Sequence, residues 1–195
     1  MRKIVAAAVM ALVVVAACSA TAATNAGHAT TAGARATDTP AFVGRWSRVT
    51  TCQEIVAMLT KAGLGAIAPA MLAGNGLVSG TPQQLAMKPN ICAGARPRVH
   101  YHYFTKDGRF GSLDWNEEPV DDGRYRIVDA RTFRIGQALF RYRVSGNQLA
   151  LTPVITAAAK RQALAKPLDF STAGWQVAVA FPGHTWKRVP CKGWC

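Results

Sequence analysis

The sequence has no apolar run long enough to cross a membrane as a helix. Its first apolar stretch, Ile4 to Ala17, is 14 residues long, whereas a membrane-spanning helix needs about 20. Arg2 and Lys3 stand directly before it. Two positive charges followed by a short apolar core are the layout of a secretory signal. We therefore predict an export signal over residues 1–17 and not a transmembrane span.

Acidic residues are scarce. The chain has 10 Asp and Glu against 23 Lys and Arg, and its formal net charge is +13. A field of that sign attracts anionic lipid head groups and anionic wall polymers. Nucleic acid does not fit an exported protein. The excess of Arg and Ala can also reflect a GC-rich genome alone, and net charge does not decide between these two explanations.

The usual catalytic and metal-binding motifs are absent. No two cysteines have the two-residue spacing of zinc ligands. The sequence has neither a Gly-x-Ser-x-Gly elbow nor a His-Glu-x-x-His motif. The letters Gly63-x-Gly65-x-x-Ala68 follow a predicted helix instead of a strand, so they are not a dinucleotide site. We expect no cofactor and no metal, and the sequence favours a non-enzymatic function over an exported hydrolase.

Cysteine is used five times, and the first position has a distinct context. The signal ends in Val15-Ala16-Ala17-Cys18, which resembles the bacterial lipobox. This resemblance implies that Cys18 is the lipidated residue, carrying acyl chains such as palmitate. It also implies anchoring on the extracytoplasmic side of the cell membrane. The other four cysteines form an even set, which predicts two disulfides with three connectivities open. They are Cys52, Cys92, Cys191 and Cys195.

Two regions follow the cleavage site. Residues 18–41 are mainly Ala, Thr, Gly and Ser, with too few large apolar groups to offset the entropy of ordering them, so we predict a flexible tether. Residues 42–195 are long enough to bury a full core. One or two helices are expected outside the sheet, over Cys52–Gly63 and near Ile155–Ala165. Residues 64–97 are rich in Gly, Pro and Ala, and the segment Ile67–Leu72 is only a candidate for a further short helix.

The rest of this domain has the pattern of short antiparallel strands. Apolar and polar residues alternate, as in Phe140, Tyr142 and Val144 against Arg141 and Arg143. Such alternation indicates one buried and one solvated face, with the Arg residues outward. Eight or nine strands at this spacing predict a barrel or a sandwich. The expected strands are 42–51, 99–104, 109–115, 123–128, 132–135, 139–145, 148–152, 175–181 and 185–189.

A family resemblance rests on both ends of the domain. Gly44-Arg45-Trp46 opens the first strand and Trp186-Lys187-Arg188 closes the last. The two segments resemble the calycin group, to which lipocalins belong. The resemblance implies an eight-stranded antiparallel barrel in which Arg188 packs over Trp46 as a cation–π pair. It also implies the disulfides Cys52–Cys92 and Cys191–Cys195, at opposite barrel ends.

Two features depart from lipocalins. A helix follows the first strand, and the Thr-Asp-Tyr type of motif is missing. The chain is also similar to uncharacterised exported actinobacterial proteins in three segments, which supply no activity. These are residues 107–114, 120–125 and 182–188.

The barrel predicts a function through its interior. We expect aromatic side chains to face inward and to contact a small apolar or amphipathic ligand, because an eight-stranded barrel holds either packed side chains or one small ligand. The candidates are Tyr101, Tyr103, Trp115, Tyr125, Phe140, Tyr142, Trp175 and Phe181. The alternative is a solid barrel whose basic face docks on anionic lipid, a wall polymer or a protein partner.

Two polar clusters have plainer interpretations. His100 and His102 are two apart on a strand, but no third metal ligand is evident, so we expect surface or rim histidines. The acidic segment from Asp114 to Asp122 lacks the Gly and Glu of a calcium loop and is expected to offset neighbouring Arg residues. Ser112, Asp114 and His184 form a catalytic triad only on paper, because geometry defines a triad.

Overall fold

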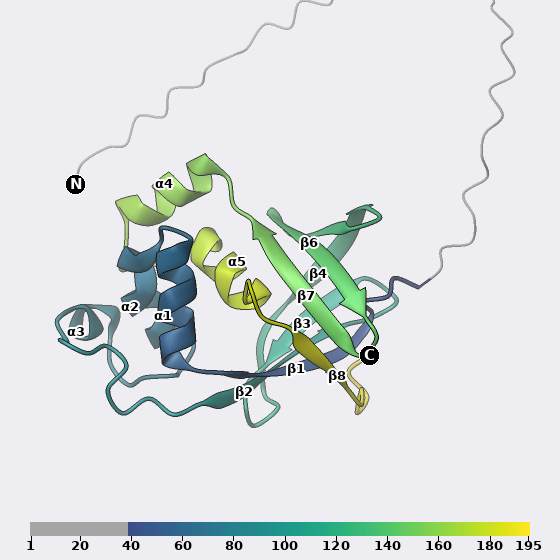
Figure 1. The fold of residues 1–195 in the computed structure, drawn as a ribbon, viewed down its shortest axis with the longest axis horizontal. Helices are drawn as coiled ribbons and strands as arrows, with labels where there is room; N and C mark the ends of the chain where they lie inside the picture. Colours follow the sequence, from purple (N-terminus) through teal and green to yellow (C-terminus); the bar gives the residue numbers. More distant parts are fainter. Residues whose placement is uncertain (1–38) are drawn as a thin grey trace, which may run out of the picture. The chain divides into compact units, whose positions relative to one another are not determined.

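The computed structural model describes residues 39–195 (Figure 1). The predicted signal, Cys18 and all but the last residues of the predicted tether lie outside the described residues. Residues 39–195 belong to one compact unit. Within the described part of the chain, no helix is both long and apolar enough to cross a membrane.

Eight antiparallel strands close into a barrel, in which each strand pairs with its sequence neighbours and β1 pairs with β8. This confirms the predicted mainly-β barrel. The strands are β1 (Gly44–Thr50), β2 (Arg98–Phe104), β3 (Arg109–Leu113), β4 (Pro119–Asp129), β5 (Thr132–Ile135), β6 (Ala138–Ser145), β7 (Gln148–Val154) and β8 (Trp186–Val189).

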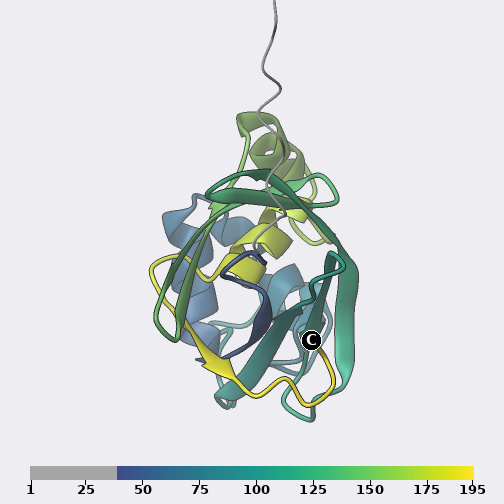
Figure 2. The ribbon, with the colours of Figure 1, turned by 90° about the vertical axis from the view of Figure 1, so that its right-hand side faces the viewer.

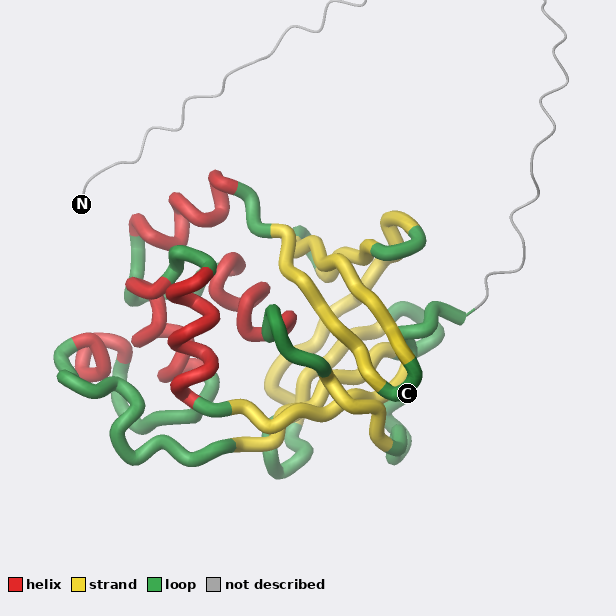
Figure 3. Tube along the Cα trace, in the orientation of Figure 1, coloured by secondary structure: helices red, strands yellow, loops and turns green. Residues whose placement is uncertain are grey.

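The helices gather at one end of the barrel (Figures 1 and 3). They occupy the β1–β2 and β7–β8 connections, and both connections leave the sheet at the same end because β1 and β7 run in the same direction. We call this end the mouth and the opposite end the closed end. The described part of the chain has five α-helices, where the sequence predicted one or two. They are α1 (Cys52–Lys61), α2 (Ala68–Gly74), α3 (Pro82–Ala86), α4 (Ala157–Ala165) and α5 (Thr172–Ala180), with a 3-10 turn at Gly65–Ile67.

Helix α1 begins where the sequence predicts. Thr51 and Glu54 form a reciprocal capping box, in which each side chain accepts a hydrogen bond from the other residue's backbone N–H. Such a box satisfies two otherwise unpaired donors of the first turn. Cys52, the first residue of α1, forms a disulfide with Cys92, and Cys191 pairs with Cys195. Both predicted disulfides are confirmed.

Helix α5 replaces a predicted strand, so the strand expectation over Trp175–Phe181 was wrong. Ser171 caps the helix by accepting a hydrogen bond from the Gly174 N–H. The segment is apolar on nearly every side because it sits across the barrel mouth. The Gln176 Nε2 donates to the carbonyl of Leu139 on β6, at 3.2 Å. Figure 2 shows α5 within the ring of strands.

Aromatic rings fill the closed end. The Phe42 ring stacks on Phe133 at 4.8 Å and meets Tyr142 edge-on at 4.6 Å. At the rim of this end, the Arg188 guanidinium lies 4.2 Å from the centre of the Trp46 ring and also donates to the Ala41 and Val43 carbonyls. The barrel-closing contact that the resemblance implied is therefore present.

Candidate functional site: a pocket at the barrel mouth

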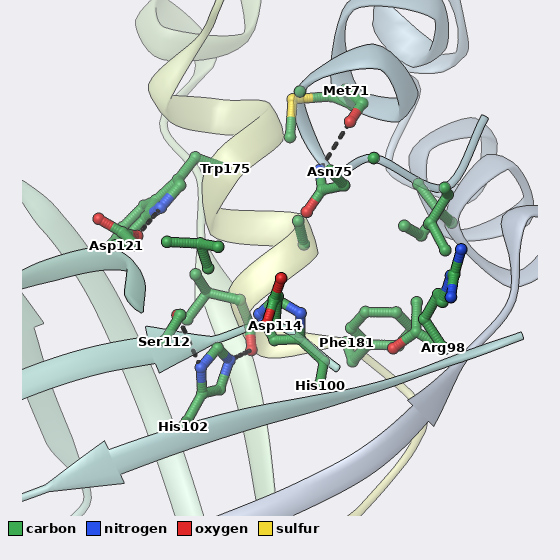
Figure 4. A pocket seen from close by; sticks show the side chains of 18 of the residues that line it. Met71, Asn75, Arg98, His100, His102, Ser112, Asp114, Asp121, Trp175 and Phe181 are labelled. Atoms are coloured by element: carbon green, nitrogen blue, oxygen red, sulfur yellow. Dashed lines mark hydrogen bonds between the residues drawn. The ribbon is translucent and has the colours of Figure 1, made fainter. Parts of the chain in front are cut away.

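A cavity of about 340 Å³ lies between the strands at the mouth and the helices that cover it (Figure 4). Strands β2 and β3 supply its floor, α1 and α2 one wall, and α5 another. This volume is at the small end of the range for ligand pockets. The barrel is thus solid at one end and hollow at the other.

Three of the predicted aromatic residues line this pocket: Trp115, Trp175 and Phe181. Two are held by arginines stacked on their rings, since Arg98 lies 4.0 Å from the Trp115 ring centre and Arg48 lies 4.2 Å from that of Phe181. The Arg48 charge is balanced by Glu54 at 2.8 Å. These contacts fix the orientation of two apolar walls while their cations stay near the pocket.

His102 and Ser112 form a buried pair on the floor. They are direct cross-strand neighbours, and the Ser112 hydroxyl lies 2.9 Å from Nδ1 of His102. The other ring nitrogen, Nε2, lies 3.1 Å from the Val179 carbonyl of α5. A carbonyl only accepts, so Nε2 carries the proton and Nδ1 accepts from Ser112. Burial, together with the neighbouring His100, holds the pKa of His102 well below its usual value.

His100 is the second histidine of the floor. Its ring lies edge-on to that of His102, at 5.4 Å. Burial lowers the pKa of His100 to about 4, and the nearby Asp114 carboxylate opposes this shift only in part. At neutral pH the pocket therefore holds two uncharged imidazoles. The expectation that both histidines are surface or rim residues was wrong, because they share the inward face of β2.

Several polar groups in the pocket have unused hydrogen-bonding capacity. The Thr50 hydroxyl is buried and has no hydrogen-bond partner among residues 39–195. Asp121 accepts from the Trp175 indole N–H, but in the same part of the chain no cation lies within salt-bridge distance of its half-buried carboxylate, and burial raises its pKa. One oxygen of Asp114 accepts from the backbone of Asn116 and Glu118. Unsatisfied buried polar groups are costly, so they mark a place where a bound molecule would supply partners.

The remaining predicted ligand residues lie elsewhere. Tyr125, Phe140 and Tyr142 do face inward, but their rings belong to the aromatic packing around Phe42 and Phe133. Tyr101 and Tyr103 lie on the opposite face of β2 from His102, so the expectation that they face inward was wrong. Their outer surface is covered: Arg45 stacks on Tyr101 and Trp194 packs on Tyr103.

Arg45 is an exception to the outward, solvated arginines. Its side chain lies on the outer face but is only 1% exposed. It pairs with Glu117 at 3.0 Å, and Lys192 of the C-terminal segment pairs with the same carboxylate. The acidic segment therefore neutralises Arg45 and Lys192, not the arginines of β3 and β4 that the sequence suggested.

The structure does not bring Ser112, Asp114 and His184 together as a catalytic triad. Ser112 bonds His102, whereas His184 lies 3.9 Å from Glu54. Within residues 39–195, no group of three or more His, Cys, Asp or Glu side chains is arranged to hold a metal ion.

The sequence pattern did not identify His100, His102, Ser112 and Thr50 as pocket residues. One signal in the sequence pointed to the inward position of His102. It lies two residues before Phe104 on β2, and residues two apart on a strand share a face. The lack of a third metal ligand favoured surface or rim histidines, and the expectation that Tyr101 and Tyr103 face inward placed His102 on the outer face. The buried partners that reverse this preference, Ser112 and the Val179 carbonyl, come from β3 and α5.

No model of a known protein family matches this chain, and no curated protein matches it in sequence.

Proposed function

We propose that this protein is an envelope-anchored lipoprotein that binds a small amphipathic molecule in the mouth of its barrel. The supporting observation is the 340 Å³ cavity that joins aromatic walls to polar side chains, among them the unpartnered Thr50 hydroxyl. A solid barrel would leave no such space. The eight antiparallel strands supply a rigid frame around the cavity. Five of the eight predicted aromatic side chains pack elsewhere and do not fill it.

The lining favours an amphipathic ligand over a purely apolar one. Trp115, Trp175 and Phe181 offer apolar surface, whereas the Thr50 hydroxyl has no partner and the pKa of Asp121 is raised by burial. An apolar molecule would bury the Thr50 hydroxyl without a partner, at a cost of about 1–3 kcal/mol. A ligand with a hydrogen-bonding head and an apolar body satisfies both parts of the lining.

Pocket occupancy can be tested with N-phenyl-1-naphthylamine, a fluorescent aromatic amine. We expect saturable fluorescence enhancement with the parent protein and at least a tenfold weaker Kd for Ala178→Phe, which places a ring in the cavity. Ala165→Phe, on the exposed end of α4, is the matched control and should bind as the parent does. Equal binding by both variants would reject the pocket as the site.

The natural ligand can be sought by native mass spectrometry of the protein purified from its own membranes in mild detergent. A co-purifying mass that Ala178→Phe loses and Ala165→Phe keeps would identify the ligand class.

The anchor is a separate part of the proposal and has its own test. Cys18→Ala should move the protein from the membrane fraction to the soluble fraction and abolish labelling by an alkyne palmitate. Retention of that label on the variant would show that another residue carries the acyl chain.

A further inference from the structure

The outer face of β3–β6 carries six exposed arginines. Because side chains alternate along a strand, they all project from the same side of the sheet. Asp122 and Asp129 are the acids on these strands that are also exposed. We call this surface the arginine face; its members are Arg109, Arg124, Arg126, Arg134, Arg141 and Arg143.

The strand register places two pairs of these arginines directly opposite each other. Arg109 faces Arg124 and Arg126 faces Arg134. Like charges in directly opposed positions destabilise a sheet. Among the described residues, only Arg109 of the six has a carboxylate within salt-bridge distance, from Asp107. The guanidinium groups of this face therefore repel one another, and binding of an external anion would reduce this repulsion.

An exposed apolar tip adjoins the arginine face. Ile127 and Val128, at the end of β4, are 46% and 54% exposed. Arg131 follows in the turn, where its backbone N–H is held by Asp129. Apolar side chains flanked by arginines are the composition of surfaces that insert shallowly at a bilayer interface.

The position of this tip relative to the chain entry indicates the occupant. Tyr142 donates to the Ala130 carbonyl in the β4–β5 turn, and its ring packs on Phe42. Ala41, the last residue of the predicted tether, is held by Arg188 nearby. The β4–β5 turn and the point where the chain enters the barrel are therefore both at the closed end. The 24 residues from Cys18 to Ala41 would span roughly 27 Å as a coil, so an anchored barrel stays close to the lipid surface.

We propose that the arginine face and the Ile127–Val128 tip dock on the anionic surface of the bilayer. Guanidinium groups bind lipid phosphates and the tip enters the head-group layer, so the barrel lies with its closed end toward the membrane and the pocket mouth away from it. This inference rests on the proposed lipid anchor and not on the pocket having a ligand.

The test uses Thr37–Cys195, the compact unit that contains the closed sheet, the core and both disulfides. Co-sedimentation is measured with vesicles of phosphatidylcholine alone and with 30% phosphatidylglycerol. We expect binding only to the anionic vesicles. A variant with Arg126→Ser, Arg134→Ser and Arg141→Ser should bind roughly a hundredfold more weakly, since each arginine near an anionic surface contributes about fivefold.

A second triple variant controls for net charge. Lys88→Ser, Arg161→Ser and Lys166→Ser remove three exposed charges from the helical end and should leave binding within a factor of three. If this variant loses as much affinity as the arginine variant, the attraction is diffuse and the proposed face is wrong.

The orientation has its own pair of variants. Ile127→Asn with Val128→Asn should weaken binding roughly tenfold. Met87→Asn with Phe170→Asn, which changes two more exposed apolar residues at the mouth end, should not. The reverse result would overturn the proposal and turn the mouth toward the lipid. Hydrogen exchange on the full anchored chain in anionic vesicles should show added protection within residues 124–143; its absence there would also overturn it.

Discussion

The closed end and the mouth of the barrel are both lined by aromatic side chains, but the rings pack on one another at the closed end and surround a cavity at the mouth. At the closed end the rings of Phe42, Phe133 and Tyr142 contact one another directly. At the mouth, Trp115 and Phe181 instead stack with arginines, and histidine, serine and threonine take the floor. Aromatic rings that pack directly on one another leave no cavity between them. Rings that stack on arginines around polar side chains leave a cavity at the mouth.

This comparison implies a division between stability and function. The closed end resembles a protein core, in which truncation creates a cavity that the surroundings fill poorly. The mouth keeps its cavity by burying polar groups at a cost. Loss of side chains should therefore affect folding at one end and binding at the other.

The largest expected effect is at the closed end. Phe133→Ala removes a fully buried ring from the aromatic packing and should lower the free energy of unfolding by about 3–5 kcal/mol. Phe170→Ala, whose ring lines the pocket but is 75% exposed, should change it by less than about 0.5 kcal/mol. Urea denaturation followed by tryptophan fluorescence measures both. Similar losses in the two variants would remove the distinction between the ends.

The two disulfides sharpen the comparison. Cys52–Cys92 closes a separation of 40 residues across the helices of the mouth, and Cys191–Cys195 closes one of 4. By loop-closure entropy, the first should stabilise the fold by about 4 kcal/mol and the second by about 2 kcal/mol. Paired Cys→Ser variants, compared by thermal unfolding, test this order. An equal or reversed order would mean that native-state contacts at the C-terminus outweigh chain entropy.

The histidines of the mouth should make stability depend on pH. The pKa of His100 is about 4 in the folded protein and ordinarily 6.5, so the unfolded chain binds a proton first. Stability is therefore unaffected above pH 6.5 and falls as the pH drops from 6.5 toward 4, with about 2 kcal/mol lost at pH 5 from this residue. His102 adds a loss of the same sign. The difference between the urea midpoints at pH 7 and pH 5 should be smaller in His100→Gln than in the parent protein. In His184→Gln it should equal that of the parent.

The polar floor gives a smaller effect of opposite sign. Thr50→Val replaces an unpartnered buried hydroxyl with a methyl group of similar size and should raise the free energy of unfolding by up to about 1 kcal/mol. The same variant should bind an amphipathic ligand more weakly. A destabilised Thr50→Val protein would show that the hydroxyl has a partner in solution and is not reserved for a ligand.

The smallest effect concerns the outer surface. Arg126→Ser removes a charge directly opposite Arg134 and should raise stability by a few tenths of a kcal/mol at low salt. The gain should vanish at 1 M salt, where the screening length is about 3 Å. Arg161→Ser on α4 is the control, and it should show no such salt-dependent gain.

Local patterns in the sequence were enough to predict most strands. Alternation along β6 and the turn residues around β7 set their bounds within two residues, because a half-buried antiparallel strand has a strict period of two. Helix α5 was missed for the opposite reason. A short helix that is apolar on nearly all sides has no periodicity to distinguish it from a buried strand.

Strand β2 shows why the pocket residues could not be predicted from the sequence. The run from His100 to Tyr103 offers two faces of similar character, and hydrophobicity alone favours the tyrosines inward. The inward face of β2 is decided by pairing with β1, where Trp46 lies opposite His102. That pairing then brings His102 to Ser112 and to the Val179 carbonyl, which satisfy its ring nitrogens.

The sequence by itself determined the period of burial along most strands, the start of α1, the even set of cysteines and the excess of positive charge. These follow from neighbours within a few residues or from composition. Only the tertiary structure decided which parity of β2 is buried, that α5 crosses the mouth, and that a cavity remains there. Those outcomes depend on side chains from strands and helices far apart in the chain, whose mutual packing no local pattern encodes.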